Sequence, residues 1–344
     1  MSSATRRSDP TRIRRKASRR SPTTSGEIIP LVARFPALAR VPRVVLGSYP
    51  TPVVHLDRIA PQLWIKRDDL CADPMGGNKA RALEFLLADV RPGDRVVTVG
   101  SAGSTHALAV VVYATRLGAH VAVGRWRQEM NATAVRVAQL LAETTDTAPV
   151  FRTPLGAYAW ASRQRQRGAR WVAAGGSTPL GILGHVNAGL ELVAQIDAGV
   201  LPQPDRVVVP LGTGGTAAGL ALAFRIARRD IHVTAVRVVP RIVGRRTRVL
   251  RLAARTSRLI ERISGERVPR VRRADLTVLH EAYGGAYGRE TEIARAAAAR
   301  LRAKSAIALD PTYSAKAFAV ALDVALGGPT LFWLTFDSRI LDSR

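Results

Sequence analysis

The sequence has few of the residues that would cross-link the chain or anchor it in a membrane. Its single cysteine, Cys71, excludes an internal disulfide and favours a reducing compartment. The apolar run from Leu108 to Ala114 is too short to span a membrane and lies between polar residues. The N-terminal region has no long apolar segment, so we do not expect a secretory signal. These absences predict a cytoplasmic chain with no membrane partner.

Lysine is also scarce, because five lysines stand among 52 basic residues. One of them, Lys79, lies in the glycine-flanked turn Gly76-Gly77-Asn78-Lys79, at the start of a predicted helix. Arginine stays protonated near neutral pH, whereas a lysine whose pKa is lowered can form a Schiff base. A lysine kept where glycines let the backbone approach a ligand therefore indicates covalent catalysis.

Acidic residues are few, and 26 Asp and Glu against 52 Lys and Arg give a formal net charge of +26. Such an excess is typical of proteins that bind nucleic acid or an anionic surface. The richness in Ala, Arg, Gly and Val is also typical of a GC-rich genome, and the charge is spread along the chain. We favour this second explanation and expect no specific nucleic-acid partner, although a basic field would still attract small anionic substrates.

Two segments hold the densest positive charge. Residues 1–28 are rich in Arg, Ser and Thr and predict a disordered basic tail. A tail without a role is the interpretation we favour, and a transit peptide or a nucleic-acid-binding arm are the alternatives. In residues 241–273, arginines at helical spacing predict an amphipathic surface helix with a solvated face. An anion or nucleic-acid face is the alternative, which the absence of interleaved aromatic residues disfavours.

From about residue 40, short β-branched runs alternate with helical stretches rich in Ala and Leu. The predicted strands are 95–100, 121–124, 150–151, 171–174, 206–210 and 233–239, and the predicted helices are 106–117, 132–142, 180–196 and 217–228. This alternation predicts an α/β fold with parallel sheets and crossover helices. Ligands of such sheets bind at the carboxyl ends of strands, where several glycine-rich loops fall.

Two of these loops have the chemistry of an anion site. In Gly212-Thr213-Gly214-Gly215-Thr216, a strand leads into a helix whose first N–H groups would cradle a phosphate. It is not a Walker loop, because no Gly-Lys-Ser/Thr follows, and a tight turn is the alternative. In the loop 100–106, Ser104 or Thr105 caps a helix, or its hydroxyls and the His106 ring lie near a bound carboxylate or cofactor.

Two further loops carry weaker signals. Gly175-Gly176 precedes Pro179 and predicts an ordinary strand-to-helix turn. In Asp310-Pro311-Thr312-Tyr313, the phenol either faces a site or belongs to a half-buried tyrosine with its hydroxyl in water.

Taken in this order, the motifs resemble one family, the pyridoxal-phosphate enzymes of the tryptophan-synthase-β type (fold type II). Within it, the chain is most similar to the aminocyclopropane-carboxylate deaminase and D-cysteine desulfhydrase group. The resemblance runs from about Arg43 to Phe332. It is carried by Lys66-Arg67-Asp68-Asp69-Leu70, Gly76-Gly77-Asn78-Lys79, Ser104-Thr105-His106, Gly212 to Thr216, Asp310 to Tyr313, and Tyr287 after Gly284-Gly285.

The resemblance implies pyridoxal 5'-phosphate as the cofactor and a cleft between two lobes as its site. Lys79 matches the lysine that holds the cofactor as a Schiff base. The implied catalytic residues are Lys79, Ser104, Tyr313 and Tyr287. The implied cofactor-binding residues are Lys79, Asn78, Thr105, Gly212, Thr213, Gly214, Gly215, Thr216 and Thr335. The implied substrate-binding residues are Ser104, Thr105 and His106, and no metal is expected.

The resemblance also implies an organisation. We expect a large α/β domain of residues 29–82 and 171–344, a small α/β domain of residues 83–170, and a homodimer.

The sequence departs from the family's pattern near the expected site. Thr105 stands in place of an asparagine, and Ser314 in place of the glutamate of aminocyclopropane-carboxylate deaminases, which argues against that activity. Phe336 and Asp337 replace two glycines at the end of the last strand. We predict a lyase or deaminase of a small amino acid, with D-cysteine desulfhydrase-like β-elimination as the best interpretation. The alternative is a diverged member with weakened or different catalysis, either a binding role or another amino-acid substrate.

Overall fold

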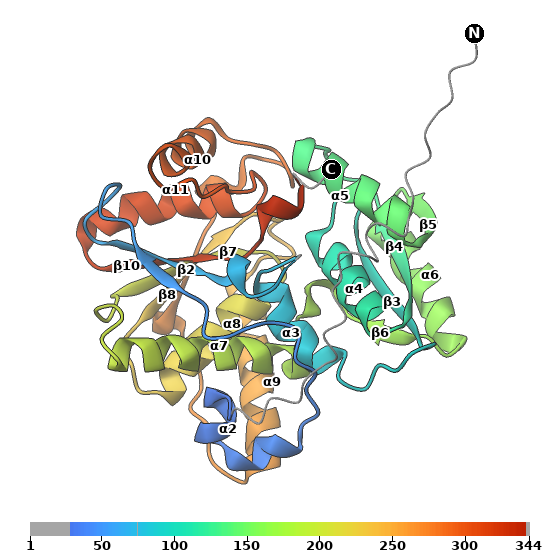
Figure 1. Cartoon of the computed structure of the whole chain (residues 1–344), viewed down its shortest axis with the longest axis horizontal. Coiled ribbons are helices and arrows are strands. Elements are labelled where there is room, and N and C mark those ends of the chain that lie inside the picture. Colours follow the sequence, from blue (N-terminus) through green and yellow to red (C-terminus); the bar gives the residue numbers. More distant parts are fainter. Residues whose placement is uncertain (1–27, 74, 342–344) are drawn as a thin grey trace.

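The chain folds into two sheets that lie side by side, each flanked by helices (Figure 1). The computed structural model describes residues 28–73 and 75–341, apart from the side chains of residues 146–149. The predicted basic tail therefore falls outside the described residues, except for Ile28.

The larger sheet has six strands in the order β1-β2-β10-β7-β8-β9. They are β1 (Val53–His55), β2 (Leu63–Arg67), β7 (Arg206–Leu211), β8 (His232–Arg237), β9 (Leu276–Leu279) and β10 (Thr330–Leu334). All neighbours are parallel except β1 and β2, which pair antiparallel. The predicted α/β fold is confirmed, and this antiparallel edge pair is an addition to the expected parallel sheets.

Helices cover both faces of this sheet. They are α7 (Pro179–Asp197), α8 (Gly215–Ile226), α9 (Arg246–Ser264), α10 (Glu292–Ser305) and α11 (Ser314–Val324), with the short α2 (Pro30–Arg34) beside α7. Val207 and Val209 of β7 lie in the core formed with α7, α8 and α9, whereas Val208 lies in the core with α10 and α11. The alternation fits a strand that is buried on both sides.

The smaller sheet has four parallel strands in the order β5-β4-β3-β6. They are β3 (Arg95–Ser101), β4 (His120–Trp126), β5 (Asp146–Phe151) and β6 (Arg170–Val172), and the helices near them are α3 (Asn78–Leu86), α4 (Thr105–Arg116), α5 (Ala132–Thr144) and α6 (Pro154–Gln166). Val96 lies in the core with α4 and α5, and Val97 in the core with α6. This sheet is therefore also covered on both faces.

The predicted strands and helices are confirmed, with bounds that differ by a few residues. β6 ends at Val172 rather than at residue 174, because the chain turns into the left-handed conformation at Gly175 (φ 70°). β6 also belongs to the smaller sheet and crosses the expected domain boundary at residue 170. The division into domains stays a prediction.

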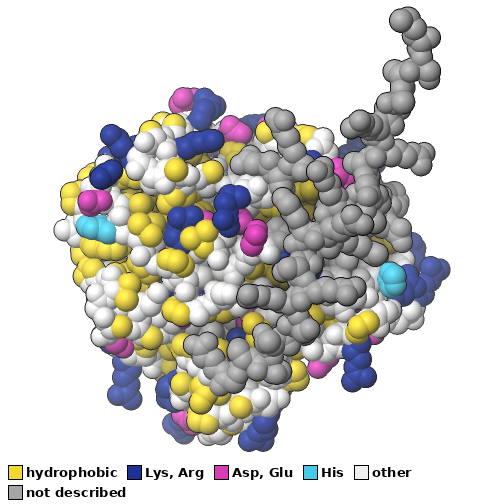
Figure 2. Space-filling view, in the orientation of Figure 1, with side chains coloured by type: hydrophobic (Ala, Val, Ile, Leu, Met, Phe, Trp, Pro, Cys, Tyr) yellow, Lys and Arg dark blue, Asp and Glu magenta, His cyan; other side chains and the backbone are white. Residues whose placement is uncertain are grey.

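The second basic segment forms the predicted amphipathic helix, α9. Its buried residues are Val249, Leu252, Ala253, Thr256, Ser257 and Ile260, and its arginines lie on the other face. Lys and Arg side chains are scattered over the visible face of the molecule in separate groups (Figure 2). Among the described residues, no helix combines the length and apolarity needed to cross a membrane.

Candidate active site

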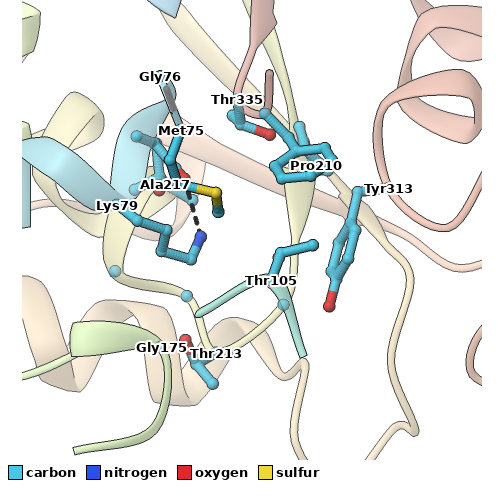
Figure 3. Close-up of a pocket in the computed structure, with 16 residues that line it drawn as sticks. Met75, Gly76, Lys79, Thr105, Gly175, Pro210, Thr213, Ala217, Tyr313 and Thr335 are labelled. Carbon is cyan, nitrogen blue, oxygen red and sulfur yellow. Dashed lines mark hydrogen bonds between the residues drawn. The ribbon is translucent and has the colours of Figure 1, made fainter. Parts of the chain in front are cut away.

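A pocket lies where the carboxyl ends of β7 and β10 meet the starts of α3 and α4 (Figure 3). It encloses about 590 Å³ of empty space, counted with its opening to solvent. Its lining residues are Met75, Gly76, Asn78, Lys79, Thr105, Gly175, Pro210, Gly212 to Ala217, Tyr313, Thr335 and Phe336. The pocket lies at the carboxyl ends of parallel strands, where such sheets place their ligands.

The turn before α3 brings the chain close to the end of β10. Gly77 has φ 126°, and a Cβ atom there would lie 2.4 Å from the carbonyl oxygen of Thr335. The N–H of Asn78 donates to that same oxygen at 3.1 Å. Only glycine fits this position, because any side chain would separate the two segments. The turn thereby fixes where α3 starts and where Lys79 points.

The amine of Lys79 lies in the pocket and has a neutral hydrogen-bond partner. Its Nζ donates to Oδ1 of Asn78 at 2.8 Å. Burial lowers the pKa of Lys79 to about 8, against the smaller opposing effect of the Asp310 carboxylate. A fraction of this amine is therefore neutral at physiological pH and can act as a nucleophile or a base.

Opposite Lys79, the loop from β7 to α8 has a geometry that suits an anion cradle. Gly214 is the residue that precedes α8, with φ 97° and no side-chain cap, so the first N–H groups of the helix stay available for an anion. The Thr216 hydroxyl accepts from Nδ2 of Asn78 at 2.7 Å, which ties the cradle to the start of α3. The Oγ atoms of Ser177 and Thr213 lie 2.6 Å apart.

The phenol of Tyr313 lines the other side of the pocket, whereas Tyr287, which contacts it, is not among the lining residues. Tyr313 faces Lys79 across it, with Thr105 between them (Figure 3). The hydroxyls of Tyr287 and Tyr313 are hydrogen-bonded, and their rings meet edge to face at 5.9 Å between centroids. Burial raises the pKa of both, and the Tyr287 phenol raises that of Tyr313 further. Both phenols therefore keep their protons at neutral pH.

The third predicted element, the loop before α4, contributes less directly. Thr105 lines the pocket, whereas Ser104 and His106 are not among the lining residues. Ser104 caps α4, because its Oγ accepts from the N–H of Ala107 at 3.2 Å. His106 is buried with its Nε2 3.3 Å from Oγ1 of Thr98. Burial lowers the pKa of His106 to about 3, so its ring is neutral.

Sequence reasoning missed part of the lining. Gly175 was expected to form an ordinary turn, yet it borders the pocket, and a Cβ there would lie 2.1 Å from Oγ1 of Thr213. The turn itself is as predicted, with Thr178 capping α7 and Pro179 at its first position. The signal available was that Gly175 follows a strand, like the other pocket loops. Met75, Pro210 and Ala217 were not predicted to line the pocket either, whereas Phe336 lies near the site as its place in the sequence indicates.

The arrangement suits a ligand that carries both an aldehyde and a phosphate. A partly neutral amine can capture an aldehyde, and uncapped N–H groups at a helix start can bind a dianion. Both features lie in one pocket, joined through Asn78 and Thr216. Within the described ranges, no group of three or more His, Cys, Asp or Glu is placed to hold a metal ion.

Comparisons with known proteins agree with this chemistry. Residues 44–331 match the family described as pyridoxal-phosphate dependent enzyme. The chain is 31% identical over 302 residues to a D-cysteine desulfhydrase of Klebsiella pneumoniae, covering 83% of this chain and 89% of that protein. It is 33% identical over 326 residues to the nocardicin C-9' epimerase of Nocardia uniformis, covering 88% and 94%. A solved crystal structure of an ACC deaminase homologue superposes with a TM-score of 0.73 at 27% identity, covering 91% of this chain and 98% of that one.

Proposed function

Because the chain belongs to the family of pyridoxal-phosphate-dependent enzymes, we propose that it is a lyase or deaminase of a small amino acid that catalyses β-elimination of the D-cysteine desulfhydrase type. One observation carries this proposal: the Lys79 amine, with its lowered pKa, shares a pocket with an anion cradle and a protonated phenol. Each of these groups has a separate task in such a reaction.

The residues of the pocket fit the cofactor. Lys79 would hold its aldehyde, the cradle from Gly212 to Thr216 its phosphate, and Asn78 and Thr335 would border its ring. When bound, pyridoxal phosphate supplies an electron sink that stabilises negative charge at the α-carbon of an amino acid. The protein must then supply proton transfer, substrate orientation and exclusion of water.

Lys79 is the best-placed base. With a pKa of about 8, its free amine can take a proton from the α-carbon and return it elsewhere. Tyr313 faces it across the pocket and holds a proton on Oη, so it can assist a leaving thiol by donating a hydrogen bond or the proton itself. Tyr287 is hydrogen-bonded to Tyr313 and can replace that proton.

The loop before α4 is the proposed site of the substrate carboxylate. Thr105 offers a hydroxyl inside the pocket, and the N-terminus of α4 offers backbone N–H groups and a favourable dipole. We propose that Ser104 fixes the start of α4 through its cap, and that His106 supports the loop through its contact with Thr98.

Elimination is preferred over ring-opening deamination because Ser314 follows Tyr313 where the deaminases that the chain resembles have a glutamate. The test is a panel of D- and L-cysteine, D- and L-serine and 1-aminocyclopropane-1-carboxylate. We expect D-cysteine to give equal amounts of pyruvate, ammonia and hydrogen sulfide. Turnover of the cyclopropane substrate alone, or of no panel member, would contradict the proposal.

A second candidate is a reaction at the α-carbon of a different amino acid, without elimination. The observation that favours it is Phe336, which lines the pocket where the resembled family has glycine and would change the room beside the substrate. A relative at 33% identity is named an epimerase. Exchange of the α-proton in D₂O without release of a keto acid would identify this activity.

We also propose that the chain acts as a homodimer in the cytoplasm. The family resemblance supports the dimer, and the single cysteine, buried Cys71, suits a reducing compartment. Sedimentation of the purified holoenzyme tests whether it is a dimer. Fractionation of the source cells tests whether it is in the cytoplasm.

A further inference from the structure

The side chain of Asn131 joins the segment that carries Tyr287 to the segment that carries Tyr313. Asn131 lies between β4 and α5, on the smaller-sheet side of the pocket. Its Nδ2 donates to the carbonyl oxygen of Gly288 at 2.7 Å and to Oγ1 of Thr312 at 2.9 Å. Gly288 follows Tyr287 and Thr312 precedes Tyr313, so one amide contacts a neighbour of each phenol, through the backbone of Gly288 and the hydroxyl of Thr312.

The surrounding contacts show a close junction between the same segments. Gly288 has φ 89°, and a Cβ there would lie 2.9 Å from the carbonyl oxygen of Glu129. Glu129 also pairs with Arg289 at 3.3 Å. Gln128 accepts from the N–H of Gly103 at 3.1 Å, in the loop that leads to α4. The 128–131 segment therefore contacts the proposed carboxylate loop on one side and the phenol segments on the other.

The contact between Tyr287 and Tyr313 depends on holding together two segments that are separate along the chain. Tyr287 belongs to the irregular segment between β9 and α10, and Tyr313 to the turn before α11. Within the Tyr313 turn, Asp310 fixes the backbone by accepting from the N–H of Tyr313 at 2.7 Å and of Ser314 at 3.0 Å. The Tyr287 segment has its own anchor in Lys316, whose Nζ donates to the carbonyl oxygen of Tyr283 at 2.8 Å.

Asn131 binds both segments at once from a third segment, in addition to the direct link that Lys316 makes between them. We propose that Asn131 is a positioning residue. From the smaller-sheet side, its two hydrogen bonds, together called the clasp, hold Tyr287 and Tyr313 in fixed positions relative to each other beside the substrate. The inference rests on the proposed function, because that function gives the phenols their task. The clasp itself is a matter of two hydrogen bonds and can be measured without substrate.

Asn131 also caps α5, and the test must separate the two roles. Its Oδ1 accepts from the N–H of Ala134 at 2.8 Å. Serine is an equally good capping residue but lacks the amide donor, so Asn131→Ser keeps the cap and removes the clasp. Asn131→Ala removes both. Thr153→Ala is the matched control, because Thr153 caps α6 through the N–H of Gly156 and takes no part in the pocket.

The experiment is hydrogen–deuterium exchange of the holoenzyme, followed by kinetics. In Asn131→Ser we expect amide exchange in residues 284–291 and 311–313 to rise about tenfold, the effect of losing one or two net hydrogen bonds. Exchange in α5 and the visible absorbance of the bound cofactor should match the wild type. On the substrate identified by the panel, kcat should fall about tenfold with KM changed less than threefold.

The outcomes separate the clasp from the proposed function. Wild-type exchange in residues 284–291 of Asn131→Ser, or an equal rise in Thr153→Ala, would overturn the clasp even if the enzyme eliminates thiol from D-cysteine. A wild-type enzyme inactive on the whole panel would overturn the proposed function, while the exchange data would still decide the clasp.

Discussion

Two lysines of one sequence region, Lys66 and Lys79, have opposite surroundings. Lys66, on β2, is fully buried, and its Nζ donates to the Thr51 carbonyl at 2.7 Å and to Glu191 at 2.6 Å. Lys79, at the start of α3, has the neutral amide oxygen of Asn78 as its partner at 2.8 Å. In the described part of the chain, Lys79 forms no ion pair with a carboxylate, whereas Lys66 does.

The ion network around Lys66 is complete. Arg81 donates to Asp68 at 2.7 Å and to Glu191 at 2.8 Å, so two cations meet two carboxylates in the protein interior. The pair of cations balances the pair of anions, which is the condition for burying charge at tolerable cost. This network links residues of β2, α3 and α7.

The difference teaches how the protein makes one buried amine structural and another reactive. Burial is the main cause that lowers the pKa of both. At Lys66 the Glu191 carboxylate opposes that effect and forms an ion pair with the amine, whereas Lys79 faces the pocket with a pKa of about 8. The comparison predicts that loss of Lys79 removes activity and that loss of Lys66 removes stability.

The largest expected effect is the loss of activity in Lys79→Ala. We expect kcat/KM to fall about 10⁴-fold, since this variant loses the proton-transfer base and the covalent hold on the cofactor. Steady-state kinetics on the substrate found by the panel measures it. Lys304→Ala, at an exposed position, is the control and should keep wild-type rates. A Lys79→Ala enzyme within tenfold of the wild type would break the comparison.

The second effect is on stability. Lys66→Ala leaves two buried carboxylates opposite Arg81 alone, and we expect the free energy of unfolding to fall by about 3–5 kcal/mol. Urea unfolding of the apoprotein measures this value, with Lys304→Ala as the control. Lys79→Ala should change it by less than about 1 kcal/mol, because it removes no ion pair. Equal losses in the Lys66 and Lys79 variants would contradict the division of roles.

The third prediction concerns the anion cradle, residues 212–216, which shares the pocket with Lys79. Apoprotein should bind pyridoxal phosphate about 100-fold more tightly than pyridoxal, the effect of one or two charge-assisted hydrogen bonds from the cradle. Gly214→Ala should reduce this preference, because φ 97° is strained for alanine and the new Cβ would lie 3.1 Å from Val249.

Gly199→Ala is the matched control, since Gly199 also has positive φ but no atom within 4 Å of its Cβ position. Fluorescence titration gives both dissociation constants. An equal affinity of the wild type for the two ligands would show that the cradle does not bind phosphate.

The smallest effect concerns pH. A pKa of about 8 leaves roughly one Lys79 amine in ten neutral at pH 7, and the neutral fraction saturates about one unit above the pKa. The lowered pKa therefore moves reactivity toward neutral pH. The rate at which apoprotein captures the cofactor should rise up to about tenfold per pH unit below 8 and level off near pH 9. Stopped-flow absorbance measures it, and a rate still rising at pH 10 would contradict the lowered pKa.

The fold could be predicted from the sequence to a large extent because its signals are local. The β-branched run that became β3 and the arginine spacing of α9 each report a burial pattern within one element. The glycine-flanked Lys79 and the Gly212 to Thr216 loop also carry their chemistry in adjacent residues.

What could not be predicted depends on contacts between distant segments. Glu191 reaches Lys66, and Asn131 reaches Gly288 and Thr312, through tertiary packing that leaves no local pattern. Gly175 was interpreted as a turn because its partner, Thr213, lies on another loop. The roles assigned to all the site residues, Ser104, His106 and Tyr287 among them, stay predictions.

Reduction of the holoenzyme with borohydride, followed by peptide mass mapping, tests the central claim most directly. The reduced cofactor should be found on the peptide that contains Lys79, with Lys16, Lys66, Lys304 and Lys316 unmodified. Modification of any other lysine in place of Lys79, or no covalent cofactor at all, would contradict the account.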